Sequence, residues 1–179
     1  MLFARMLRAA MLDQKLYAEL RSDPVAGTQA VVVVLLGTVA AVIAVIIASQ
    51  FTIDSDISTA EAVGRGLIIM PGVWLVPAAS GFFLGRIFHE RQDGPPPTSE
   101  MLTVLGFSAA PAVLLIFLII PIVGQVMGVL VPLWLLVSMA AAVKSALRVA
   151  FIRGLMTIAP GFVLTILIGI SQAPSDGGG

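Results

Sequence analysis

The stretch MLTVLGFSAAPAVLLIFLIIPIVGQVMGVLVPLWLLVSMAAAV, residues 101–143, decides the fold, because no charged residue interrupts it. A membrane-spanning helix needs about 20 mainly apolar residues, so two spans fit into this stretch, at about 101–119 and 124–143. The residues between them, 120–123, are apolar and too few to form a separate element. They predict an antiparallel helical hairpin whose turn lies in the outer membrane interface.

Three more apolar runs lie outside this hairpin, at about 28–49, 66–88 and 154–170. Hydrophobic residues make up 59% of the 179 residues and charged residues only 11%, which is far from the composition of soluble domains. The sequence therefore predicts an all-α integral membrane protein with a five-transmembrane-helix bundle. This membrane domain covers residues 23–171 and leaves an N-terminal segment, 1–22, and a flexible external tail, 172–179.

Nine of the ten lysines and arginines fall into three segments that alternate with acidic or uncharged ones. These basic residues are Arg5, Arg8, Lys15 and Arg21 before the first span, Arg86 and Arg91 after the second, and Lys144, Arg148 and Arg153 between the fourth and fifth. Because flanking lysine and arginine resist translocation, this bias places the N-terminus in the cytoplasm and the C-terminus outside. Ten acidic residues balance the ten basic ones, which argues against a nucleic-acid partner.

The N-terminal segment predicts an amphipathic helix at the cytoplasmic surface, over about residues 2–20. Its apolar face holds Phe3, Met6, Leu7, Ala10 and Tyr17, and its polar face holds Arg5, Arg8, Lys15 and Glu19. Leu12, Asp13 and Gln14 break this pattern. Two interpretations stay open: a helix that binds the membrane surface or a partner, or a helix packed under the bundle. On the first interpretation, the expected contact residues are Phe3, Arg5, Met6, Leu7, Arg8, Lys15 and Tyr17.

Small residues recur at four-residue spacing inside the spans, where they let helices approach closely. The candidate packing residues are Ala40, Ala44 and Ala48 in the first span, Gly81 and Gly85 in the second, and Gly124 and Gly128 in the fourth. Pro71 and Pro77 are expected to bend the second span. Bent helices line cavities in some transporters, although proline is also ordinary in membrane helices.

Catalytic chemistry has no candidate in this sequence. Apart from Arg86 near the end of the second, the five apolar runs contain no ionisable residue, and the one histidine, His89, stands at a helix end beside charged neighbours. Serines 80, 108 and 138 have no buried base to activate them. A lone histidine and the absence of cysteine argue against a metal site or a cofactor. In the outer loop, Asp54, Asp56 and Glu61 could hold a hard cation, but no fixed ligand set accompanies them. Ser58 to Glu61 has the spacing of a capping box and Glu61 can pair with Arg65, so a solvated helix start better explains two of these charges.

Several short motifs resemble the bacterial branch of the Yip domain family. They are Gly106-Phe107-Ser108-Ala109-Ala110-Pro111, Ile120-Pro121-Ile122-Val123-Gly124, Pro132-Leu133-Trp134 and the run 140–147 that contains Lys144; the opening 12–30, with Asp23-Pro24, is similar too. The resemblance covers most of the chain and implies five transmembrane helices with a cytoplasmic N-terminus, in the bacterial cytoplasmic membrane.

Eukaryotic members of that family are implicated in vesicle traffic through prenylated small GTPases. Their acidic, tyrosine-containing segment is missing here, and the sole tyrosine, Tyr17, has a different context, which argues against a GTPase partner. The expected partners are the lipid bilayer and a membrane protein or a second copy of the chain.

The residues favour a non-enzymatic membrane-organising scaffold, adaptor or accessory subunit. The alternative is a small transporter or channel for an uncharged or lipid-like substrate, with Gln125, Ser80, Ser108, Ser138 and Thr157 as the available lining groups. An enzyme that acts on lipid ranks third.

Overall fold

A computed structural model describes residues 1–51, 59–89, 92 and 94–171, and within these ranges the regular structure is entirely helical. The elements are α1 (Leu2–Ala10), α2 (Gln14–Ser22), α3 (Ala26–Phe51), α4 (Thr59–Phe88), α5 (Thr98–Ser108), the 3₁₀ helix η1 (Ala110–Ile119), α6 (Pro121–Leu147) and α7 (Phe151–Ser171). The predicted outer-loop acids Asp54 and Asp56, and the predicted tail 172–179, lie outside the described residues.

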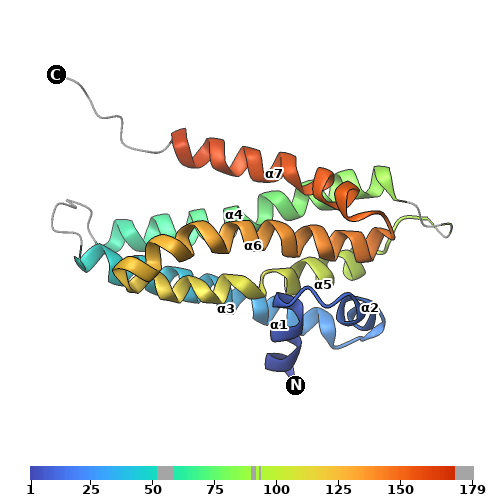
Figure 1. Ribbon diagram of the computed structural model, residues 1–179, viewed down its shortest axis with the longest axis horizontal. Coiled ribbons are helices and arrows are strands. Elements are labelled where there is room, and N and C mark those ends of the chain that lie inside the picture. Colours follow the sequence, from blue (N-terminus) through green and yellow to red (C-terminus); the bar gives the residue numbers. More distant parts are fainter. Residues whose placement is uncertain (52–58, 90–91, 93, 172–179) are drawn as a thin grey trace.

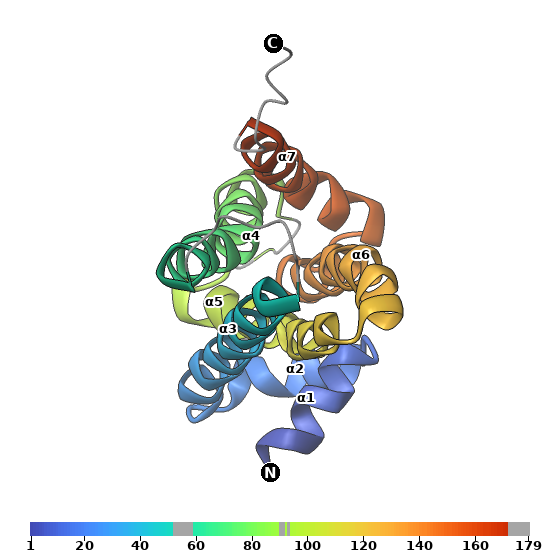
Figure 2. The same cartoon turned by 90° about the vertical axis from the view of Figure 1, so that its left-hand side faces the viewer.

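The long helices lie side by side along one axis and form a bundle (Figure 1). Figure 2 shows the same bundle from one end, with α7 at its outer edge. α3 packs against α5 and η1, α6 packs against η1 and α7, and α4 packs against α7. One stripe of α6 faces the interior at every fourth residue, because an α-helix returns to the same face after about 3.6 residues. This buried stripe contains Val131, Leu135, Met139, Val143 and Leu147.

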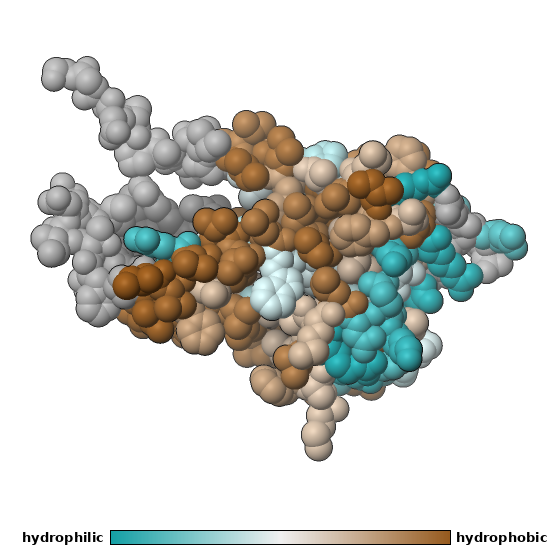
Figure 3. Space-filling view, viewed as in Figure 1, coloured by the Kyte–Doolittle hydropathy of each residue, from teal (hydrophilic) through white to brown (hydrophobic). Residues whose placement is uncertain are grey.

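Four described segments are long and apolar enough to cross a membrane: Ala26–Ala44, Thr98–Ile119, Ile122–Leu147 and Phe151–Ile168. A shorter apolar stretch, Gly72–Phe88, lies within α4, where the second of the five spans was predicted. Large apolar side chains such as Val129, Leu133 and Ile166 point outward on these segments. Figure 3 shows apolar surface over the bundle and hydrophilic surface gathered at one end. The all-helical fold is thus confirmed in the described residues, and the length and composition of these segments are consistent with a membrane helical bundle.

The third predicted span, 101–119, is divided into α5 and η1 rather than being one α-helix. Pro111 explains the change, because a proline inside an α-helix lacks an N–H and its ring clashes with the carbonyl four residues earlier. The chain continues as a tighter helix that rises about 2.0 Å per residue. A single residue, Ile120, then separates η1 from α6, whose first residue is Pro121. Proline suits that position, since its missing N–H would have no intrahelical partner.

The N-terminal segment forms two short helices where one continuous helix over residues 2–20 was predicted. Leu12 lies between them with φ 61°, a left-handed backbone conformation that ends α1. Asp13 then begins α2, because its carboxylate accepts hydrogen bonds from the backbone N–H groups of Lys15 (2.9 Å) and Leu16 (3.4 Å). The residues that interrupted the sequence pattern are therefore a cap and a turn.

Candidate functional site

The two N-terminal helices form one compact unit that is docked on the bundle; we call α1 and α2 together the N-terminal unit. α1 packs against α5 and η1, and α2 packs against α5 and α6. The unit buries Met6 and Ala9 from α1, and Leu16, Tyr17 and Leu20 from α2. α1 runs across the long axis of the bundle instead of along it (Figure 1). A helix lying across a bundle of spans has the orientation expected for the membrane interface.

Arg8 holds the N-terminal unit together internally. Its guanidinium donates from Nε to Asp13 at 2.7 Å and from both terminal nitrogens to Glu19 at 2.9 and 3.0 Å. These bonds favour the ionised carboxylates, so they hold the pKa of Asp13 and the pKa of Glu19 below their ordinary values. The same two carboxylates raise the pKa of Arg8. The turn between α1 and α2 is therefore fixed by charge as well as by capping.

Two other arginines tie the unit to the membrane helices. Arg5 donates to Gln29 Oε1 of α3 at 2.7 Å and pairs with Asp23. A hydrogen bond from the Val25 N–H, followed by the bond from Arg5, holds the pKa of Asp23 below its usual range. Arg21 donates to the backbone carbonyl of Ser145 on α6 at 2.7 Å and lies 3.6 Å from Glu100 of α5. Arg21 of α2 thus contacts both α5 and α6, which belong to the two arms of the predicted hairpin.

Tyr17 and Trp134 add two neutral contacts to the same interface. The Tyr17 hydroxyl lies 3.2 Å from Ser138 Oγ on α6 and donates to the Ala9 carbonyl at 3.4 Å. Burial raises the pKa of Tyr17 to about 12, so the phenol stays neutral at physiological pH. Trp134 Nε1 donates to the Ala10 carbonyl at 2.8 Å, at the end of α1. Each contact satisfies a polar group at the edge of an apolar environment.

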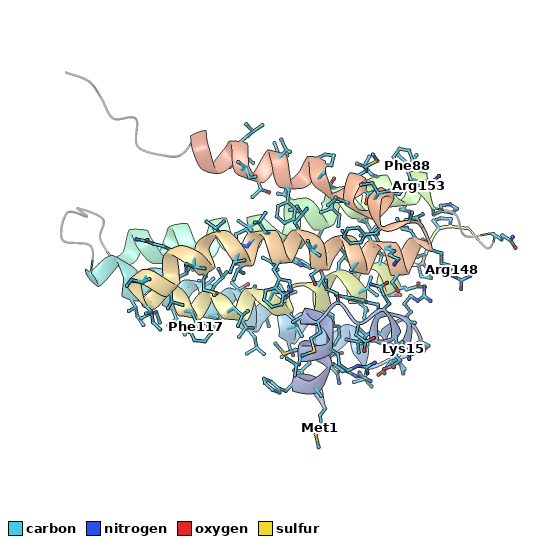
Figure 4. The ribbon with its side chains drawn as sticks, in the orientation of Figure 1. Met1, Lys15, Phe88, Phe117, Arg148 and Arg153 are labelled. Carbon is cyan, nitrogen blue, oxygen red and sulfur yellow. The ribbon has the colours of Figure 1, made fainter. Side chains whose placement is uncertain are left out.

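One face of the N-terminal unit stays open. Phe3 and Leu7 on α1 are 78% and 50% exposed, and Met11, the residue after α1, is 69% exposed; Lys15 on α2 is also exposed (Figure 4 labels Lys15). Of the other predicted contact residues, Met6 and Tyr17 are buried, while Arg5 and Arg8 are partly buried in ion pairs. The predicted set is therefore divided between residues that anchor the unit and residues that remain accessible.

The predicted small-residue positions lie at helix contacts of different tightness. Ala40 and Ala44 are buried in α3, and the side chain of Ala48 lies outside the described ones. A Cβ added at Gly81 would lie 3.1 Å from Ile158 Cγ1, and one at Gly85 would lie 2.8 Å from Leu147 Cδ1. At Gly124 it would meet the backbone oxygen of Leu118 at 2.6 Å, whereas at Gly128 its nearest neighbour would be 3.7 Å away.

Sequence reasoning missed four other glycines that lie at close contacts between helices. An added Cβ would come 2.9 Å from Ala112 Cβ at Gly37, 2.7 Å from Ala30 Cβ at Gly106 and 2.7 Å from the Ala140 carbonyl at Gly154. At Gly161 it would come 2.5 Å from Pro77 Cα. These glycines pair with residues on other helices, so a search for four-residue repeats within one helix does not find them. Their signal in the sequence is the isolated glycine in an apolar run.

Two apolar cavities open on the sides of the bundle. The first has a volume of about 400 Å³ and lies between α3, α4 and α5, with Val31, Leu35, Trp74 and Leu102 in its wall. Trp74 Nε1 is already bonded to the Leu105 carbonyl at 3.2 Å. The second, of about 270 Å³, lies between the C-terminal end of α4 and the start of α7 and is lined by Phe88, Arg153, Met156 and Thr157.

Four of the five polar side chains expected to line a transport pathway form hydrogen bonds within the protein. Ser80 donates to the Thr157 carbonyl at 2.7 Å, Ser108 to the Leu105 carbonyl at 2.6 Å and Thr157 to the Gly154 carbonyl at 2.7 Å. Ser138 bonds with Tyr17, and Gln125 is exposed. Across the described part of the chain, no group of three or more histidine, cysteine or carboxylate residues is placed to hold a metal ion.

Comparison with known proteins identifies a family. A family model described as the Yip1 domain matches residues 13–171, which include α2 and all the helices of the bundle but not α1. No curated protein and no solved structure matches the chain. The matching family is not one of known enzymes.

Proposed function

Since this chain belongs to the Yip1 domain family, we propose that it is a membrane-organising scaffold or accessory subunit that binds a membrane partner. The observation that carries the proposal is the state of the N-terminal unit: ion pairs and hydrogen bonds fix it to α3, α5 and α6, yet Phe3, Leu7 and Lys15 remain accessible. A rigid surface loses little conformational freedom on binding, which favours a stable contact with a partner.

The proposed topology has five spans, with α4 as the second. Lys15, Arg148 and Arg153 lie toward one end of the bundle in Figure 4, while Phe117 lies toward the other. The positive-inside tendency supports a cytoplasmic location for the end that carries these basic residues, in a bacterial cytoplasmic membrane. On this topology the N-terminal unit faces the cytoplasmic interface, where an adaptor meets both lipid and soluble or membrane partners.

Site-specific photocrosslinking in native membranes tests the partner role. A photoreactive amino acid is placed at Phe3 or at Lys15 of the full chain, and the matched control position is Ile166, an exposed apolar residue of α7. We expect the same protein to be crosslinked from positions 3 and 15 but not from 166. If positions 3 and 15 yield only lipid adducts, and the purified chain has the native mass of a lone monomer, the adaptor role is wrong.

The cavity between α3, α4 and α5 favours a second candidate function, the transport of an uncharged or lipid-like molecule. Its wall is almost wholly apolar and it opens sideways next to Leu102, which is exposed. On this candidate, purified protein retains a small apolar molecule, and the bulky substitution Leu102→Trp displaces it. The substitution Leu133→Trp on the lipid-facing side of α6 is the control and leaves the molecule bound.

A further inference from the structure

Two hydroxyl groups lie in the wall of the cavity between α3, α4 and α5. Ser99 and Thr103 stand four residues apart on α5, so they share one face of that helix, and both line the cavity. The other lining residues that the structure describes are apolar or glycine, among them Val31, Leu35 and Leu102. The cavity, of about 400 Å³, therefore combines a long apolar wall with a small polar patch.

The Thr103 hydroxyl has hydrogen-bonding capacity that the described residues do not use. Thr103 is only 7% exposed, and no described side chain or carbonyl bonds its hydroxyl, whereas Thr38 donates to the Val34 carbonyl at 2.9 Å. The neighbours of Trp74 along the chain at positions 68–71 are isoleucine, isoleucine, methionine and proline, whose side chains carry no oxygen or nitrogen. An unpaired hydroxyl in an apolar environment is unfavourable, which favours a ligand that supplies an acceptor.

The polar patch lies at the end of the cavity where two spans begin. A Cβ added at Gly27 would be 3.5 Å from Thr103 Oγ1, and one added at Gly106 would be 2.7 Å from Ala30 Cβ, so α3 and α5 run in the same direction. Gly27 and Ser99 are each the second residue of an apolar segment long enough to cross a membrane. The hydroxyls therefore lie near the level of a membrane interface, where the ester groups of bilayer lipids also lie.

We propose that this cavity holds an ester-linked acyl chain of a bilayer glycerolipid, with the ester carbonyl accepting a hydrogen bond from Thr103. The cavity follows α3 from Gly27 to Leu35, a rise of about 12 Å, which suits an extended chain better than a compact molecule. Val31 and Leu35 are 59% and 57% exposed, so the chain enters sideways from the surrounding hydrocarbon. Ser99, one turn nearer the interface, faces the glycerol backbone of the lipid.

Native mass spectrometry of the full chain measures binding, with diester and diether phosphatidylcholine of equal chain length as the two probes. The lipids differ in their carbonyl groups, so we expect the diester to be retained roughly five- to tenfold better, which corresponds to one hydrogen bond. Thr103→Val removes the hydroxyl and is expected to abolish this preference, while Thr103→Ser keeps it. The matched control is Thr165→Val on α7, whose hydroxyl donates to the Gly161 carbonyl at 2.9 Å away from the cavity. This control is expected to preserve the preference.

Three results would overturn the proposal. They are equal retention of the two lipids by the unaltered chain, a preference that survives Thr103→Val, and a preference that Thr165→Val removes to the same extent. Thermal unfolding of the lipid-free variants checks the fold. Thr103→Val is expected to unfold at the temperature of the unaltered chain, because the lost hydroxyl bonds no described group, and Thr103→Ala replaces it if it does not fold.

This inference rests on the second candidate function in placing a lipid-like molecule in the same cavity, but the two fail differently. Movement of the diester lipid between the leaflets of protein-containing vesicles is measured beside its retention. A lipid that is retained through Thr103 and not moved supports the site and excludes transport of that lipid. Retention of another apolar molecule, displaced by Leu102→Trp and unaffected by Thr103→Val, supports transport and overturns the ester site.

Discussion

At the scale of single residues, one buried hydroxyl shows how the N-terminal unit is held in register. Tyr17 has no exposed surface, and its oxygen reaches both Ser138 on α6 and Ala9 at the end of α1. The ring fills apolar space, while the hydroxyl forms a hydrogen bond with Ser138, which is buried in the bundle. One side chain therefore joins three helices.

The substitution Tyr17→Phe is expected to lower the free energy of unfolding by about 1 kcal/mol, because it removes the hydroxyl and keeps the ring. Ser138→Ala is expected to cost a similar amount, and the double variant no more than either change alone, because both remove the same bond. Thermal unfolding in detergent measures the three values. Fully additive losses would show that the two hydroxyls act independently.

Glycine positions differ in how close the opposite backbone lies. Gly161→Ala is expected to destabilise the protein by about 1–3 kcal/mol, since its new methyl group would come within 2.5 Å of Pro77 Cα and neither backbone can yield cheaply. Gly72→Ala on α4 is the matched control, because nothing lies within 4 Å of its added Cβ. Denaturation in detergent compares the two variants, and equal effects would mean that α4 and α7 approach less closely than described.

At the scale of elements, the N-terminal unit depends on ionised carboxylates. Asp13, Glu19 and Asp23 have depressed pKa values in the folded protein, so their stabilisation is fully present above the ordinary carboxyl pKa of about 4 and is lost as pH falls through the depressed values. We expect α1 and α2 to become susceptible to proteolysis or hydrogen exchange below about pH 4, before the spans do.

Arg8→Gln is the variant that checks this pH response. Without the guanidinium, the pKa values of Asp13 and Glu19 return toward their ordinary range. The susceptibility of α1 and α2 to proteolysis or hydrogen exchange is therefore expected to be higher at neutral pH and to change less with pH. A variant with the same acid transition as the unaltered chain would show that another group controls docking.

The elements also show what the sequence predicts and what it misses. Apolar runs and proline positions locate the helices well, since length and composition decide which segments enter lipid. The division of 101–119 at Pro111 was open to prediction from that proline, and the break at Leu12 to Gln14 was visible as a disturbed pattern. Which helix faces Gly106 or Gly161 depends on packing between distant segments, which periodicity in one segment does not encode.

At the scale of the whole molecule, the absence of cysteine makes the proposed topology directly measurable. Single variants Lys15→Cys and Gln92→Cys are expected to react with a membrane-impermeant thiol reagent only from the cytoplasmic side, and Ser175→Cys only from the outside, because five spans put the two ends on opposite sides. Intact cells and inverted vesicles give the two measurements. Reaction of Lys15→Cys and Ser175→Cys from the same side would exclude an odd number of spans.

Family membership and the multi-pass helical architecture follow from residues 13–171, whereas the arrangement of the N-terminal unit does not. The amphipathic pattern of residues 2–20 fits both a free surface helix and a docked one, because both bury one face. The docked state is distinguished by two hydrogen bonds, Arg21 to Ser145 and Trp134 to Ala10, each between residues 124 positions apart. Contacts of that range are set by tertiary structure.

These long separations have a consequence for biosynthesis. The N-terminal unit is translated first, but its partners on α6 are translated more than a hundred residues later, after α3, α4, α5 and η1. Until α6 emerges, the unit lacks its contacts with Ser138, Ser145 and Trp134 and is more available to chaperones, proteases and lipid than in the complete fold. Docking therefore marks the completion of the hairpin, and a nascent chain stalled before residue 130 should display α1 and α2 as unprotected segments.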